Sequence, residues 1–176
     1  MRIEEKLAAL GLVLPEAPKM PPGVRPGFAW VRVYGDRAYI SGHGPQQPDG
    51  SFAGPFGKVE VAISPDEAYQ AARLCALAML GGLKRALGDL DRVTAWLMVS
   101  GMVNAVSGSS ASTNAINGCS DLILELYGEE IGQHARTAVG MAALPLDLPI
   151  VIAAEVAIAP KGLPLPHSQS ANQNAV

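Results

Sequence analysis

The sequence contains few of the residues that build a disulfide framework or a metal centre. Of its 176 residues, only two are cysteines and three are histidines. Cys75 and Cys119 lie in segments expected to be helical, and neither has metal-ligand spacing with His43, His134 or His167. We therefore expect a reduced protein in which both cysteines are small apolar fillers, with no disulfide, no metal and no cofactor.

Charge is also scarce, which limits the partners that the chain can bind. Only 16% of the residues are charged and the formal net charge is -3, which disfavours nucleic-acid binding through phosphate neutralisation. No apolar run has the length of a membrane span, and the N-terminal MRIEEKLAALGL lacks the layout of a signal peptide. These features predict a cytoplasmic protein that contacts neither nucleic acid nor membrane.

Apolar residues, in contrast, make up 49% of the chain, which is a high fraction for a soluble monomer. Because no segment is expected in a membrane, the surplus apolar surface is best explained by contacts between subunits. The composition therefore predicts an oligomer.

Two long helices are predicted from apolar periodicity and capping signals. Ser64 with Glu67 has the pattern of a capping box, and Gly88 ends the apolar repeat that follows. For the second helix, Ser112 is the expected cap and Gly128 the expected end. A shorter amphipathic helix is expected over residues 2–10.

Four further segments have the alternation or β-rich composition of strands. A hairpin is expected in FAWVRVYGDRAYISG, and the other strands in DRVTAWLMVSGMV, ARTAVGMAAL and IVIAAEVAI. The predicted order is β-β-α-β-α-β-β, which gives an α+β fold with two helices packed on one mixed sheet. No Ser-His-Asp, Cys-His or paired-carboxylate motif is recognisable, and GPFGK lacks the spacing of a phosphate-binding loop.

Arg136 is the most informative polar residue, because it begins an otherwise apolar strand in HARTAVGMAALP. A guanidinium group stays charged and requires an acceptor. One interpretation is a structural salt bridge with Glu155 on a neighbouring strand, since a carboxylate in an apolar strand must be paired or face a cavity. The other is a ligand site for an anion from outside the chain. The residues alone favour neither interpretation.

Other polar residues are weaker candidates. Ser41 and Gly42 end a strand, either as a tight exit or as a place where a ligand approaches backbone N–H groups. His43 in the following loop is more often a solvated residue than a base. His134 has the pattern of a loop-surface residue, and Asn117 that of a helix residue facing solvent.

Several of these motifs together resemble the Rid/YjgF family, the reactive intermediate deaminases that are also labelled endoribonuclease L-PSP. The motifs are YISGHGP, the long capped helix, GDLDRV before a strand, HARTAVGMAALP and the closing IAAEVAI. On this basis the Rid-like domain spans residues 24–159. Residues 1–23 form the helix and a proline-rich lead-in, and residues 160–176 are expected to be a disordered tail.

The resemblance implies a chorismate-mutase-like homotrimer with ligand clefts between subunits. In the family, the arginine that begins the penultimate strand grips the carboxylate of a 2-imino or 2-keto acid, and here that residue is Arg136. Backbone donors are implied at Gly42, after Ser41, and at Ala138. The active members hydrolyse imines such as 2-iminobutyrate and 2-aminoacrylate to the keto acid and ammonia.

This sequence departs from the family pattern at several positions. Ala138 replaces a common cysteine, and Phe28 stands near a tyrosine position. The glutamate thought to position the attacking water corresponds to Ala153 or Val151, depending on the alignment, and only a shifted register would let Glu155 serve.

Asn117 corresponds to a site asparagine, on a helix about one turn longer than usual. His43 is a second substitute for the absent glutamate.

These observations lead to several functional hypotheses. The leading one is a trimer that binds small 2-imino or 2-keto carboxylates at Arg136 and hydrolyses the imine. The alternative is a trimer that binds a metabolite or a partner without catalysis. Hydrolysis of a larger imine or amide is a variant of the first, and ribonuclease activity is disfavoured by the acidic net charge.

Overall fold

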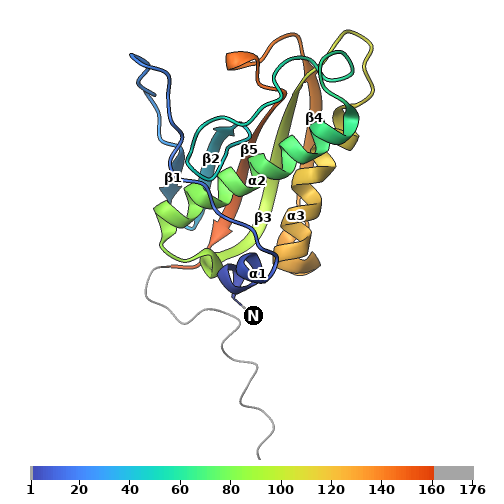
Figure 1. Ribbon diagram of the computed structural model, residues 1–176. Coiled ribbons are helices and arrows are strands. Elements are labelled where there is room, and N and C mark those ends of the chain that lie inside the picture. Colours follow the sequence, from blue (N-terminus) through green and yellow to red (C-terminus); the bar gives the residue numbers. More distant parts are fainter. Residues whose placement is uncertain (1, 161–176) are drawn as a thin grey trace, which may run out of the picture.

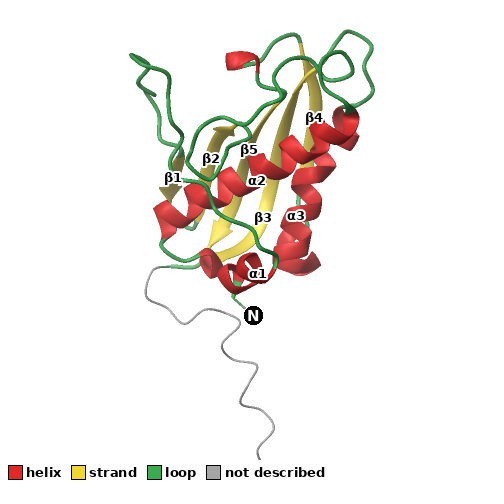
Figure 2. Ribbon diagram, in the orientation of Figure 1, coloured by secondary structure: helices red, strands yellow, loops and turns green. Residues whose placement is uncertain are grey.

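The computed structural model describes residues 2–160, so the expected tail over residues 161–176 lies outside the described part of the chain. A five-stranded sheet with strand order β1-β2-β5-β3-β4 forms one layer, and only the β3–β4 pair is parallel. Helices α2 and α3 cover one face of this sheet, and the short α1 lies at its lower end (Figures 1 and 2). The elements are α1 (Ile3–Ala9), β1 (Val31–Tyr34), β2 (Arg37–His43), α2 (Pro65–Leu87), β3 (Val93–Asn104), α3 (Ser112–Gly132), β4 (Ala135–Met141) and β5 (Ile150–Ile158), with 3₁₀ turns at Leu90–Arg92 and Pro145–Asp147.

The predicted α+β architecture is therefore confirmed, including the element order and the mixed sheet. Helix α2 begins and ends where the local signals place it. The Ser64 hydroxyl accepts a hydrogen bond from the Glu67 amide, and the Glu67 carboxylate accepts one from the Ser64 amide. Gly88 adopts a left-handed conformation with φ of 82°, which glycine reaches without strain.

Helix α3 differs from the prediction at both ends. Ser112 is its first helical residue and Ala111 occupies the cap, so Ser112 is not the capping residue. Gly128 interrupts the helix with φ of 72° and ψ of 175°, but a further turn continues to Gly132. The capping prediction failed because the hydroxyl that accepts a hydrogen bond at this helix start belongs to Ser109, whose Oγ accepts from the Ala111 amide.

The two long helices approach each other closely through Gly118 of α3. A Cβ atom at this position would lie 2.0 Å from the carbonyl oxygen of Tyr69, which belongs to the α2 backbone. The approach is possible because glycine leaves no side chain between the helices. Around this contact the core is built from small residues of α2, including Ala68, Ala72 and Ala76, all 0% exposed.

The two faces of the sheet differ in cover. Side chains that face the helices are buried, such as Ile150, Ile152 and Val156 of β5. On the opposite face, Tyr39, Val139 and Met141 remain 43%, 47% and 38% exposed. No helix of the described chain covers this open face (Figure 2). Among residues 2–160, no helix has the length and apolar character needed to cross a bilayer.

His43 is buried on the helix-facing side of β2, contrary to the expectation of a solvated loop residue. Its side chain is 1% exposed and packs near the Trp30 ring, with centroids 5.1 Å apart. Nδ1 lies 2.6 Å from the Ser41 carbonyl oxygen, whereas Nε2 has no hydrogen-bond partner among the described residues. Burial lowers the pKa of His43 from 6.5 to about 4, and the Arg85 charge acts in the same direction.

Replacing Gly118 with alanine is expected to force α2 and α3 apart. The new methyl group would overlap the Tyr69 carbonyl, so we expect Gly118→Ala to lower the free energy of unfolding by about 3 kcal/mol. Urea denaturation followed by far-UV circular dichroism measures this change. Gly27→Ala is the control, because a Cβ there would meet nothing within 4 Å. A more stable Gly118→Ala protein would contradict the close approach, because alanine otherwise favours a helix.

The buried His43 should make stability depend on pH. As pH falls from 6.5 to about 4, the unfolded chain gains a proton that folded His43 does not accept. The free energy of unfolding should therefore fall by up to about 3 kcal/mol over this window. His43→Asn keeps a donor for the Ser41 carbonyl but does not titrate. Because the carboxylates titrate in both proteins, the difference between their stability–pH curves isolates His43, and parallel curves would refute the assignment.

Candidate anion-binding site

Arg136 lies on β4, the strand at one edge of the sheet. It is paired in register with Val99 of the parallel strand β3. Side chains alternate along β4, so Arg136 points toward α3 whereas Ala135 and Thr137 point toward the open face. Because β4 has no neighbour on its outer side within the described chain, the guanidinium reaches the boundary between the helix layer and solvent.

Two neutral oxygens of α3 orient the guanidinium. Arg136 Nη1 donates to Asn117 Oδ1 at 2.9 Å and to Ser120 Oγ at 3.0 Å. The two acceptors account for both hydrogens of Nη1. The hydrogens on Nε and Nη2 have no hydrogen-bond partner within residues 2–160. No described carboxylate forms an ion pair with Arg136. Its positive charge is therefore available to an anion from outside the chain.

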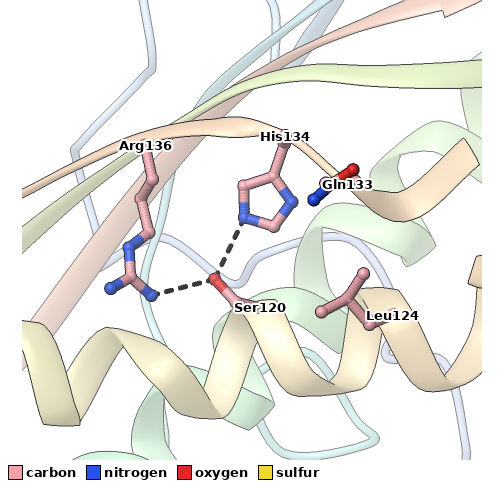
Figure 3. Close-up of a pocket in the computed structure, with 5 residues that line it drawn as sticks. All are labelled: Ser120, Leu124, Gln133, His134 and Arg136. Atoms are coloured by element: carbon pink, nitrogen blue, oxygen red, sulfur yellow. Dashed lines mark hydrogen bonds between the residues drawn. The ribbon is translucent and has the colours of Figure 1, made fainter. Parts of the chain in front are cut away.

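His134 completes a polar cluster with Ser120 (Figure 3). Its Nδ1 lies 2.7 Å from the Gly132 carbonyl oxygen and its Nε2 lies 3.0 Å from Ser120 Oγ. Since a carbonyl oxygen can only accept, Nδ1 carries the hydrogen in the neutral ring and Nε2 accepts the hydrogen of the Ser120 hydroxyl. His134 is thus tied to the site and is not a free loop-surface residue.

These side chains line a hollow that is open to solvent. It has a volume of about 200 Å³ and is lined by Ser120, Leu124, Gln133, His134 and Arg136. In Figure 3, Arg136 and His134 both project from the β4 side onto Ser120 of the helix, with Leu124 one turn further along. The hollow therefore combines one cationic group, a hydroxyl–imidazole pair and an apolar wall.

Both cysteines behave as buried fillers, as expected. Burial raises the pKa of Cys119 to about 12, although the charge of nearby Arg136 opposes the shift. Burial likewise raises the pKa of Cys75 well above its usual value. Both thiols are free and buried, so they remain protonated and take no part in the polar cluster.

The proposed Arg136–Glu155 salt bridge is wrong. Strand β3 lies between β4 and β5, so the two residues are not on neighbouring strands. Glu155 also faces the open side of the sheet, where its carboxylate pairs with Arg37 of β2. Val151 and Ala153 share this face by alternation along β5. A single chain therefore does not bring Glu155 next to Arg136.

The remaining predicted site residues fall into two groups. The half-buried Ala138 faces α3 from β4, as Arg136 does, and Asn117 contacts Arg136 from α3. Ser41 and Gly42 lie on β2, which β5 and β3 separate from β4, and the Ser41 hydroxyl donates to the Ala29 carbonyl at 2.7 Å.

Phe28 lies beside them, before β1, and is 54% exposed. One chain thus holds these two groups of predicted site residues toward opposite edges of the sheet.

Sequence reasoning missed Ser120, which joins Arg136 to His134. The available signal was its spacing of three residues from Asn117, which places both side chains on one face of a helix.

A separate group of carboxylates, Glu4, Asp89 and Asp91, lies near α1, but Arg2 and Lys84 already pair with them. This group is an ion-pair network that shares no residue with the lining of the hollow.

Comparisons with known proteins agree with this architecture. The family model described as "YjgF/chorismate_mutase-like, putative endoribonuclease" matches residues 4–156. Protein TCP17 of Trypanosoma cruzi is 34% identical over 157 residues, which cover 88% of this chain and 93% of TCP17.

Two solved structures are also similar. Atu1372 of Agrobacterium tumefaciens, a protein of unknown function, is 35% identical with a TM-score of 0.77, and the match covers 89% of this chain and 91% of Atu1372. An endoribonuclease-like protein of Shewanella oneidensis MR-1 is 27% identical with a TM-score of 0.79, over 90% of this chain and all of that one. The sequence motifs, the fold and these matches together show that this chain belongs to the Rid/YjgF family.

Proposed function

We propose that this protein binds small 2-keto and 2-imino carboxylates at Arg136 and hydrolyses the imines to the keto acid and ammonia. The observation that carries the proposal is the guanidinium held by Asn117 and Ser120 with no carboxylate of the described chain beside it. Neutral acceptors fix its orientation without cancelling its charge. The free Nε and Nη2 hydrogens form a fork that matches a carboxylate.

We further propose that the active form is a homotrimer. The open face of the sheet exposes apolar side chains, among them Tyr39, Val139 and Met141, that another copy of the chain would cover. A trimer would also explain why predicted site residues lie at both ends of one sheet. Ser41, Gly42 and Phe28 of one copy would then complete the site at Arg136 of the next.

The alternative function is binding without hydrolysis, and one observation favours it. Glu155, the only carboxylate that β5 offers, is paired with Arg37 on the open face and is not in contact with Arg136. A protein with this site and no other proton acceptor would bind keto acids as a sensor or as a partner-binding module. Release of keto acid from freshly generated 2-iminobutyrate, measured above the uncatalysed rate, separates the two functions.

Removing the guanidinium should abolish ligand binding. We expect Arg136→Met to weaken 2-ketobutyrate binding by about 100-fold in isothermal titration calorimetry, since a charge-assisted pair is lost. Arg73→Met is the matched control, because Arg73 also lies against α3 but pairs there with Glu125 at 2.9 Å. Equal affinity in Arg136→Met and the parent protein would refute the site.

A charge on the open face should dissociate the trimer. We expect sedimentation velocity to give three times the 18.3 kDa of one chain for the parent protein and a single chain for Val139→Glu, which would bury a carboxylate in the interface. Val61→Glu is the control, because Val61 is 71% exposed and lies in the loop before α2, outside the strands. A trimer that persists in Val139→Glu would place the interface elsewhere.

A further inference from the structure

Hydrolysis of an imine requires a group that accepts a proton from water and later returns one to the leaving nitrogen. Whichever alignment is used, the position of the family's strand glutamate holds Val151 or Ala153, and neither carries an ionisable group. Glu155 is paired with Arg37, and His43 is buried between the sheet and α2. Within one chain, the residues around Arg136 itself are therefore the remaining source of a proton acceptor for this chemistry.

The hollow contains such a group in His134. The Gly132 carbonyl holds Nδ1 at 2.7 Å and thereby turns Nε2 toward Ser120 Oγ, 3.0 Å away. The imidazole is thus fixed in the tautomer that can accept a proton at Nε2. This arrangement of a base, its orienting carbonyl and a hydroxyl is the geometry used for proton transfer in hydrolytic sites.

The charges around the pair favour transfer of the Ser120 hydroxyl proton. Arg136 Nη1 lies 3.0 Å from Ser120 Oγ and stabilises negative charge that develops on this oxygen. Cys119, which directly precedes Ser120, is buried and its thiol is protonated. The nearest carboxylates of α3 are engaged on its other side, Asp121 by the Tyr69 hydroxyl and Glu125 by Arg73. Past Gly128, the same helix ends with the exposed Glu129 and Glu130.

We propose that Ser120 and His134 are the proton-transfer pair of the Arg136 site and replace the family's strand glutamate. This inference rests on the proposed function, because the substrate is the 2-imino carboxylate held by Arg136. It adds two catalytic residues, both from the chain that supplies the arginine. Each proton-transfer site is then complete within one chain.

Water adds to the protonated imine carbon, and its proton passes through the Ser120 hydroxyl to His134 Nε2, leaving a neutral amino group on a tetrahedral carbon. The imidazolium returns this proton to the amino group, which leaves as ammonia while the C–N bond breaks. The hydroxyl of the tetrahedral carbon becomes the keto oxygen, and its proton passes to the departing ammonia, which is released as ammonium ion.

Two measurements on the same variants test the inference. The first is 2-ketobutyrate affinity by calorimetry, and the second is keto-acid release from freshly generated 2-iminobutyrate, measured over a series of pH values. His134→Gln keeps polar atoms near the Nε2 position but removes the base. Ser120→Ala removes the hydroxyl link and leaves the imidazole in place.

We expect His134→Gln to bind 2-ketobutyrate within about twofold of the parent protein and to release keto acid about 100-fold more slowly. The pH profile of the release rate should differ between the parent protein and the variant, because the variant has lost the imidazole. Ser120→Ala should also be slow, and its affinity shows whether Arg136 remains in place. Added imidazole should restore part of the rate to His134→Ala.

Other outcomes separate the failure of this inference from that of the proposed function. Equal release rates and pH profiles in His134→Gln and the parent protein would overturn the proton-transfer pair. Normal keto-acid binding without any release by the parent protein would also overturn it and leave the binding function intact. No binding by the parent protein would overturn both. A rate lost in Glu155→Gln but kept in His134→Gln would assign the proton transfer to β5.

Discussion

The contact between α2 and α3 at Gly118 determines the geometry of the candidate site. Gly118 lies between Asn117 and Ser120 on α3, and its missing side chain lets the helix settle against the α2 backbone. This contact fixes the depth and rotation of α3 relative to the sheet. The two oxygens that orient Arg136 therefore depend on a helix–helix contact on the other side of α3.

The sheet topology determines which polar groups can meet. Insertion of β5 between β2 and β3 gives Glu155 a partner in Arg37 and separates it from β4. The same order leaves β4 at an edge, where an arginine can reach solvent while its carbon chain stays against α3. A single strand order thus accounts for both the paired carboxylate and the unpaired guanidinium.

The features that were predictable from the sequence are those encoded by adjacent residues. Ser64, Glu67 and Gly88 determine the ends of α2 locally, and the β-branched, apolar composition of β5 is visible in its own residues. Arg136 was identifiable because a charged residue is conspicuous in an apolar strand, and Asn117 because of the family resemblance. The Ser120–His134 contact depends on how α3 lies across the end of β4, which no local pattern contains. The partner of Glu155 likewise depends on strand order. The burial of His43 depends on the packing of α2 against the sheet.

The use of both Nη1 hydrogens by α3 has a geometric consequence for any ligand of Arg136. Only the Nε–Nη2 edge remains, and a carboxylate that binds this edge through two hydrogen bonds lies in the plane of the guanidinium. In a 2-keto or 2-imino acid the reacting carbon is bonded to the carboxylate carbon and lies in this plane, and conjugation of its C=O or C=N group with the carboxylate draws the oxygen or nitrogen toward the same plane. The orientation of a single arginine would thereby distinguish the two faces of a flat, achiral molecule.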